Sequence, residues 1–202
     1  MAVGEDAHLK GLSGARRAKL YLESTMRISG AYANTDSAAC AKRLTLKWPF
    51  GGQTFSFDLG GAMRGAPYQN DYFCAEVKNY QSSGDQGTHF FEFLAKCYVA
   101  CSQDYPFGDH YMWITWAPFL VTSWAQLDSA EKVEEAVIQH RERVFGTSSE
   151  DEARNQIDAS IAKAVSERLW LFVLSVKQEG LVPLAEWRAI VAAELTRRGE
   201  TW

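Results

Sequence analysis

Apolar and polar residues alternate along several short stretches of the chain. Such alternation predicts β-strands, because successive side chains on a strand point to opposite faces of a sheet. The stretches that show it are residues 43–48, 53–59 and 71–78. Pro49-Phe50-Gly51-Gly52 predicts a hairpin turn between the first two, and Gly60-Gly61 is expected to end the second. Residues 110–117 are almost continuously apolar, which predicts a central strand covered on both faces.

Apolar residues at three- and four-residue spacing predict helices elsewhere in the chain. The predicted helices cover residues 13–29, 90–103, 127–145, 150–168 and 184–198. Residues 31–41 are small and polar, which indicates a loop. Residues 169–176 are solidly apolar and fit either a buried strand or a continuation of the preceding helix. The sequence therefore predicts an α/β protein in which helices flank a sheet.

The amino-acid composition limits the classes of protein to which the chain can belong. The chain of 202 residues is 47% hydrophobic, which suits a single domain spanning residues 1–202. It has no apolar run of about 18 residues, so we expect no membrane partner. The four cysteines show no disulfide or zinc framework, and residues 1–8 lack the apolar core of a signal peptide, so we expect a cytoplasmic location. The common motifs of NTPases, zincins and serine hydrolases are absent.

Charge is distributed unevenly. The formal net charge of −4 argues against a simple high-affinity nucleic-acid binder. Residues 1–80 carry ten Lys and Arg against seven Asp and Glu, whereas residues 81–202 carry eleven against eighteen. The basic part is compatible with a local surface that faces phosphate groups.

Three charged residues stand at the ends of two neighbouring predicted strands. Asp58 lies at the end of the second strand, and Glu76 and Lys78 lie at the end of the third. Glu76 and Lys78 share one face of their strand, so two carboxylates and an ammonium group converge if the strands pair. Mg²⁺ commonly binds to one or two carboxylates together with phosphate oxygens. The alternative to a metal site is an ordinary ion pair at the end of a surface strand.

The order Asp, spacer, Glu-x-Lys, placed on consecutive strands, resembles the PD-(D/E)XK nuclease superfamily. The resemblance implies a restriction-endonuclease-like αβββαβ core with a mixed central sheet flanked by helices, at about residues 13–120. Residues 121–202 would then be a C-terminal helical elaboration. It also implies that Asp58 and Glu76 bind Mg²⁺, for which Mn²⁺ could substitute, and that Lys78 is the catalytic lysine. Phe57 stands where many members have Pro.

Further site residues come from the same resemblance. Glu23 is the acid in the first predicted helix, where such nucleases often carry a third metal ligand; an ordinary solvated Glu is the alternative. The residues considered for substrate binding are Tyr80, Gln81 and Gln86 after the third strand, and Arg64 in the loop 62–70. The Gln-x-x-x-Tyr motif of one branch is not matched, since Phe90 follows Gln86 at that spacing.

The sequence thus favours a metal-dependent deoxyribonuclease, an endonuclease by preference. DNA is favoured over RNA as substrate, and analogy suggests a place in phage defence or mobile-element biology. A homodimer or an activating protein partner would fit such an enzyme. Two alternatives stay open. One is a catalytically inactive nuclease-fold subunit of a larger complex, and the other is an unrelated α/β interaction module whose acidic segment 128–152 contacts a partner.

Overall fold

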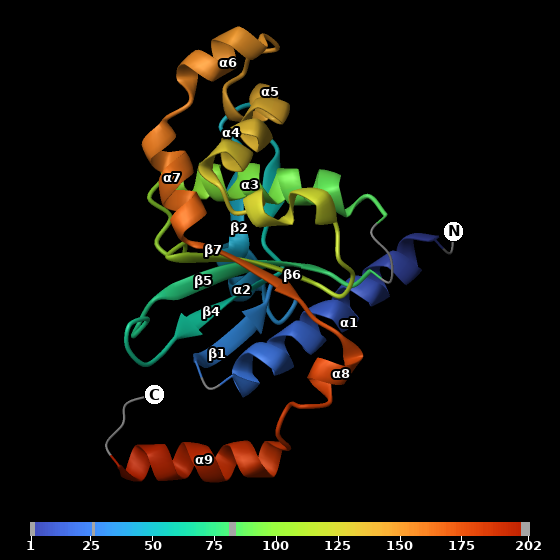
Figure 1. The fold of residues 1–202 in the computed structure, drawn as a ribbon, viewed down its shortest axis with the longest axis vertical. Coiled ribbons are helices and arrows are strands. Elements are labelled where there is room, and N and C mark those ends of the chain that lie inside the picture. The colour runs from blue at the N-terminus through green and yellow to red at the C-terminus, as the bar shows by residue number, and fades with distance from the viewer. Residues whose placement is uncertain (1–2, 26, 81–83, 199–202) are drawn as a thin grey trace.

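A five-stranded mixed β-sheet forms the centre of the computed structural model, which describes residues 3–25, 27–80 and 84–198 (Figure 1). Its strands lie in the order β1 (Ile28–Ala33), β4 (Leu59–Met63), β5 (Tyr72–Lys78), β6 (His110–Thr115) and β7 (Leu169–Val173). β4 runs antiparallel to both of its neighbours, whereas β5, β6 and β7 are parallel to one another. The carboxyl ends of β5, β6 and β7 therefore meet at one end of the sheet.

Helices cover both faces of this sheet (Figure 1). One face carries α1 (Val3–Ser24), whose Ala18 and Leu22 pack with Val77 of β5 and Ile114 of β6. The other carries α3 (Gln86–Ser102), with α4 (Ala130–Gln139) and α7 (Ala159–Glu167) outside it. The chain is an α/β protein, as its sequence predicted.

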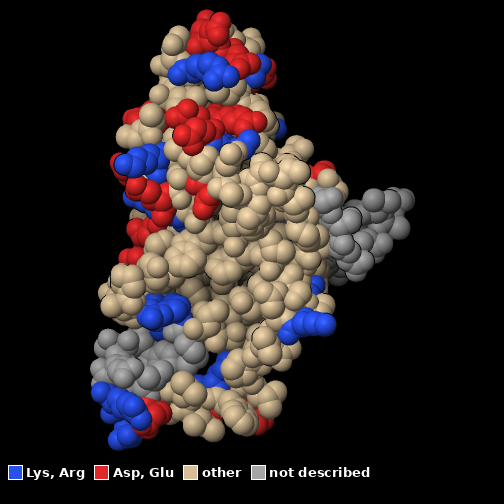
Figure 2. All heavy atoms as spheres, viewed as in Figure 1, with Lys and Arg blue, Asp and Glu red and all other residues tan. Residues whose placement is uncertain are grey.

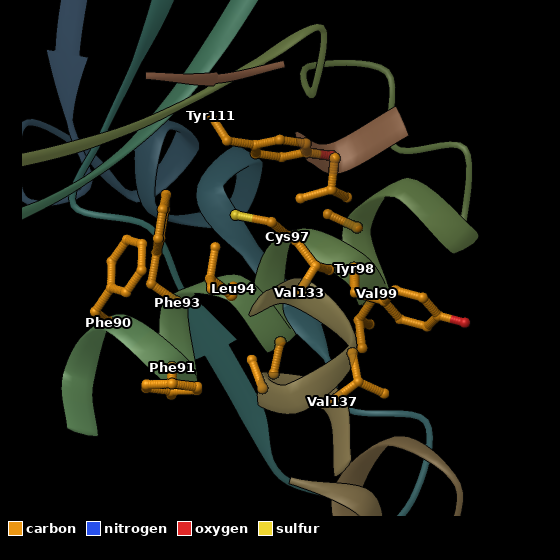
Figure 3. Close-up of a cluster of buried hydrophobic side chains, with 14 of the residues drawn as sticks. Phe90, Phe91, Phe93, Leu94, Cys97, Tyr98, Val99, Tyr111, Val133 and Val137 are labelled. Atoms are coloured by element: carbon orange, nitrogen blue, oxygen red, sulfur yellow. The ribbon is translucent and has the colours of Figure 1, made fainter. Parts of the chain in front are cut away.

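The larger part of the core lies between the sheet and α3. Figure 3 shows Leu94 and Cys97 of α3 between Tyr111 of β6 and Val133 of α4, with Phe90 of α3 to one side. Side chains of β6 alternate between the two faces, so Tyr111 points to α3 while its neighbours point to α1. Burial on both sides explains the almost continuous apolar sequence of β6 and confirms its prediction as a central strand.

Shorter elements complete the chain. They are α2 (Ala38–Leu44), β2 (Thr45–Lys47), β3 (Thr54–Ser56), the 3₁₀ helix η1 (Val121–Gln126), α5 (Arg141–Val144), α6 (Glu150–Gln156), α8 (Val176–Glu179) and α9 (Ala185–Arg197). β2 and β3 pair with each other in a separate two-stranded sheet. Among the described residues, no helix is long and apolar enough to span a bilayer.

The central sheet and the helices on its faces follow the expected order helix, three strands, helix, strand, as α1, β1, β4, β5, α3 and β6, but α2, β2 and β3 intervene between β1 and β4, and two of the expected strands were assigned wrongly. The stretches 43–48 and 53–59 contain the separate β2–β3 hairpin, while β1 occupies a segment predicted as a helix end and a loop. β4 contains Gly60-Gly61, which was expected to end a strand. A Cβ on Gly61 would lie 2.4 Å from the carbonyl oxygen of Gly30, so close approach of β1 and β4 requires the small residues that made both strands hard to recognise.

Several helix boundaries also differ from the prediction. α1 begins before Ser13 and ends at Ser24, and the helix expected over 150–168 is interrupted at Ile157-Asp158. There the Asp158 side chain accepts a hydrogen bond from the backbone of Ser160 and so caps a new helix, α7. The helix expected over 127–145 divides at His140 into α4 and α5, without a side-chain cap on α5. Residues 169–173 form β7, so the C-terminal region contributes a strand to the central sheet as well as helices.

Candidate functional site

Asp58 and Glu76 lie side by side at one end of the β4–β5 pair. Leu59 is opposite Ala75 in this antiparallel ladder, so Asp58, one residue earlier, faces Glu76, one residue later. The backbone N–H of Asp58 donates to the carbonyl of Ala75 at 2.9 Å, and the N–H of Val77 donates to Asp58 Oδ2 at 2.8 Å. These bonds hold the Asp58 carboxyl against β5, where side chains on the same face of neighbouring strands interact directly.

Glu76 is 6% exposed, and two lysines hold its carboxylate. Lys78 Nζ donates to Glu76 Oε1 at 2.9 Å, and Lys96 Nζ donates to Glu76 Oε2 at 3.3 Å. Lys78 comes from the same strand, whereas Lys96 comes from the middle of α3 and is 9% exposed. We call Asp58, Glu76, Lys78 and Lys96 the charge cluster.

The two acids of the charge cluster differ in their protonation behaviour. Burial and then repulsion from Glu76 raise the pKa of Asp58 to about 7, although the Val77 N–H and the two lysines oppose this rise. Burial acts to raise the pKa of Glu76 as well, but Lys96 and Lys78 outweigh it and lower the pKa below its ordinary value. For Lys78, burial is outweighed by Glu76 and its pKa is raised. Glu76 and Lys78 are therefore charged near neutral pH, and Asp58 is the group that titrates there.

Gln86 anchors the first turn of α3 beside the charge cluster. Its fully buried side chain accepts a hydrogen bond from Thr115 Oγ1 at 2.6 Å and donates to the carbonyl of Ala117 at 3.3 Å. Thr115 is paired with Lys78 in the parallel β5–β6 ladder. These contacts make Gln86 a link between α3 and the end of β6. Tyr80 leaves the end of β5 and stacks on His89, while Gln81 lies outside the described residues.

Glu23 and Arg64 are not brought to the charge cluster. Glu23 Oε1 accepts a hydrogen bond from the backbone N–H of Ala31 at 3.2 Å, on the outer edge of β1. Arg64 follows β4 at the end opposite Asp58, roughly 20 Å away along an extended strand. Burial lowers the pKa of Arg64 and Glu23 opposes this, which indicates that the two residues are near each other. Glu23 therefore binds the backbone of the edge strand β1 and lies away from the charge cluster.

Lys96 was not predicted as a residue of the site. A Lys is almost never fully buried unless it is paired, and Lys96 interrupts the otherwise apolar run Phe93-Leu94-Ala95 … Cys97-Tyr98. A single charged residue on the buried side of a helix therefore predicts that an opposite charge lies near it in the interior. The helix pattern does not identify the partner of Lys96, because Glu76 is 20 positions away in the sequence and lies on another element.

Asp58 and Glu76 are the two carboxylates of the charge cluster that could hold a divalent cation. Among the residues that the structure describes, no group of three or more His, Cys, Asp or Glu side chains lies close enough to hold a metal ion. Mg²⁺ is usually bound through one or two carboxylates, with water and phosphate oxygens completing its shell. Burial and then repulsion from Glu76 raise the pKa of Asp58, and a cation between the two acids would relieve the repulsion.

Comparison of the chain with models of known protein families, with curated proteins and with solved structures gives no significant match in any of the three. The function is therefore inferred from the chemistry of the charge cluster and its place in the sheet.

Proposed function

We propose that this protein is a Mg²⁺-dependent nuclease that hydrolyses phosphodiester bonds, with DNA as the favoured substrate. The observation that carries the proposal is the convergence of Asp58, Glu76 and Lys78 at one end of the paired strands β4 and β5. The order of α1, β1, β4, β5, α3 and β6 supports a restriction-endonuclease-like core. Two acids and a lysine at a strand end are the groups that metal-assisted hydrolysis of a phosphodiester needs.

In this proposal Asp58 and Glu76 would hold the cation. When bound, Mg²⁺ lowers the pKa of a water molecule and neutralises charge on the phosphodiester. Lys78 has an ammonium group 2.9 Å from Glu76 Oε1, from where it would stabilise the negative charge that develops on the attacked phosphate. Asp58 must be ionised to bind a cation, so its raised pKa makes it the residue through which pH would control activity.

Lys96 and Gln86 would act as positioning residues. Lys96 binds the second oxygen of Glu76 and fixes the orientation of that carboxylate. Gln86 ties the start of α3, the helix that carries Lys96, to Thr115 next to Lys78. Orientation by such outer contacts is expected to matter, because displacement of a ligand by about 1 Å can lower a catalytic rate on the order of a hundredfold.

A cleavage assay tests the proposal. Purified protein is incubated with supercoiled plasmid, linear duplex, single-stranded DNA and RNA, in Mg²⁺, Mn²⁺ or EDTA. We expect metal-dependent cleavage that falls at least about a hundredfold in Asp58→Asn, Glu76→Gln and Lys78→Met. Lys163→Met is the matched control, since Lys163 is an exposed lysine whose ion pair is with exposed Glu167, and it should cut as well as the unchanged protein. Full cleavage by Lys78→Met would contradict the assignment.

A catalytically silent nuclease-fold subunit is the second candidate. The observation in its favour is that Lys78 and Lys96 already neutralise both oxygens of Glu76, as a purely structural ion-pair network would. Calorimetric titration separates the two functions. Mg²⁺ or Mn²⁺ binding that is lost in Asp58→Asn supports the nuclease, whereas absence of binding together with absence of cleavage supports the silent subunit.

A further inference from the structure

β7 is an apolar strand at the open edge of the sheet. It is the last strand in the order β1-β4-β5-β6-β7, and its sequence, Leu-Trp-Leu-Phe-Val, carries no charge. All five of its side chains are half-buried, whereas those of the neighbouring β6 are almost all buried. Such an edge is a template for pairing with another strand unless the protein blocks it.

The ladder between β6 and β7 shows which backbone groups point outwards. Tyr111 N–H donates to the carbonyl of Arg168 at 2.9 Å, and Leu174 N–H donates to the carbonyl of Thr115 at 2.7 Å. Alternate residues of a strand in a parallel pair face the same neighbour, so the even-numbered residues of β7 bond to β6. The N–H and C=O groups of Leu169, Leu171 and Val173 consequently point away from the sheet. No other described residue donates to or accepts from them.

The opposite edge of the sheet, strand β1, is protected against the addition of a further strand. On β1 the outward N–H of Ala31 donates to Glu23 Oε1 at 3.2 Å, and the N–H of Ala33 donates to Asp36 Oδ2 at 2.9 Å. Charged side chains placed on an edge in this way prevent a further strand from adding to it. Within the described part of the chain, β7 has no equivalent cover.

The surface around β7 suits an uncharged partner. Figure 2, which has the view of Figure 1, shows charged side chains gathered near the top and the bottom of this face, while its middle is largely uncharged. A surface of this kind has little to attract a nucleic acid. It also presents no like charges that would repel a second copy of the same strand.

We propose that β7 pairs antiparallel with β7 of a second copy of this chain, about a two-fold axis at Leu171. Leu171 would then face Leu171 of the partner subunit, and Leu169 would face Val173 of the partner subunit. These are the residues whose backbone groups point outwards, so each such pair exchanges both of its hydrogen bonds. The pairing would join the two sheets into one and would keep α1 of both copies on the same face.

The same register brings aromatic residues together. Trp170 would stand opposite Phe172 of the partner subunit, at a position without backbone hydrogen bonds, where side chains approach most closely. Within one copy these two rings already stack, with an interplanar angle of 4°. Aromatic pairs across strands stabilise the pairing of the two strands. A standard interface buries about 800 Å² of surface on each partner, and a pair of strands of this length buries less. We therefore expect a dimer of micromolar affinity.

Sedimentation velocity of the full chain across micromolar concentrations tests the proposal. Leu171→Pro removes an outward N–H without touching the β6 ladder, and Pro is tolerated at such edge positions. It should abolish the dimer. Leu171→Lys and Leu171→Glu each place like charges on the two-fold axis and should be monomeric alone, whereas an equimolar mixture of the two should again dimerise. Far-UV circular dichroism and thermal melting of each variant establish that it is folded.

A variant on α9 supplies the control. Ile190 is a 69% exposed apolar residue of α9, so Ile190→Lys would break a dimer formed through that helix but not one formed through β7. Dimerisation that survives Ile190→Lys and is lost in Leu171→Pro supports the proposal. A monomeric unchanged protein, a dimer that survives Leu171→Pro, or failure of the charge-swapped mixture to associate would each overturn it. The proposal does not depend on the nuclease chemistry.

Discussion

Lys96 on α3 donates a 3.3 Å hydrogen bond to Glu76 on β5, and both residues are buried. This contact ties the helix on one face of the sheet to the strand that carries the candidate chemistry. Removal of one residue of a buried ion pair lowers the stability of the fold, because it leaves the other charge without a partner in the interior. The contact thus links the stability of the fold to the candidate site.

Replacing Lys96 by Met should therefore destabilise the protein by about 3–5 kcal/mol at neutral pH. The lowered pKa of Glu76 means that its ionised form contributes stability above about pH 4.5, and this contribution is lost as the pH falls. The loss in Lys96→Met should accordingly be smaller near pH 4 than near pH 7. Urea unfolding at both pH values measures it. Lys163→Met, an exposed control, should change stability by less than about 0.5 kcal/mol.

Asp58→Asn should stabilise the fold while it removes activity. The Asn side chain can still accept the hydrogen bond from Val77, but it no longer repels Glu76. The raised pKa of Asp58 costs stability as pH rises towards and through about 7, so the gain should reach roughly 2–4 kcal/mol near pH 8 and nearly vanish near pH 4. Urea unfolding in EDTA at these two pH values checks the sign. A variant that is less stable than the unchanged protein near pH 8 would refute the explanation.

Mg²⁺ should raise the melting temperature in a pH-dependent manner. Near pH 8 Asp58 is ionised and can bind a cation, whereas near pH 5 it is protonated. A ligand at about 100 times its Kd stabilises the folded state by roughly 2.7 kcal/mol, so the shift is measurable by calorimetry. Cleavage should rise over the same range, with a midpoint at or below about pH 7, because the cation favours the ionised form. Equal shifts at both pH values, or a shift retained in Asp58→Asn, would place the cation elsewhere.

Gly61→Ala should destabilise the sheet by about 2 kcal/mol or more. The new Cβ would lie 2.4 Å from the carbonyl oxygen of Gly30 and 2.6 Å from Phe73 Cε1, so β1 and β4 would have to separate. Gly11→Ala is the matched control, since a Cβ there meets nothing within 4 Å and the residue lies inside α1. It should be neutral or stabilise the protein by up to about 1 kcal/mol. Thermal melting of both variants makes the comparison.

The candidate chemistry was accessible from the sequence because it depends on short-range rules. Glu76 and Lys78 share a face through strand parity. Asp58 was expected at the end of a strand over residues 53–59, whereas it directly precedes β4, and the pairing of β4 with β5 places it opposite Glu76. The convergence of the three residues was thus expected, but the strand that brings Asp58 there was not. Strand β6 was recognised for a similar reason, since a run of apolar residues demands burial on both sides.

Features that depend on contacts between distant elements were missed. β1 and β4 are rich in Gly and Ala because they approach each other closely, and such residues have a low strand propensity. The position of Glu23 depends on where α1 meets the edge of β1, which helix periodicity does not determine. The partner of Lys96 likewise follows only from the packing of α3 on the sheet.

The balance of the charge cluster has a consequence for the capture of substrate. Above about pH 7, where Asp58 is ionised, two ammonium groups offset two carboxylates within a few ångströms, and the whole chain is slightly acidic, so the site projects little electrostatic field into solution. A polyanion would therefore not be steered towards it over long distances. We expect slow association that depends only weakly on ionic strength, with few counterions released on binding. For the proposed nuclease, attraction of a nucleic acid would then have to come from basic surfaces away from the site, or from a second, more basic protein.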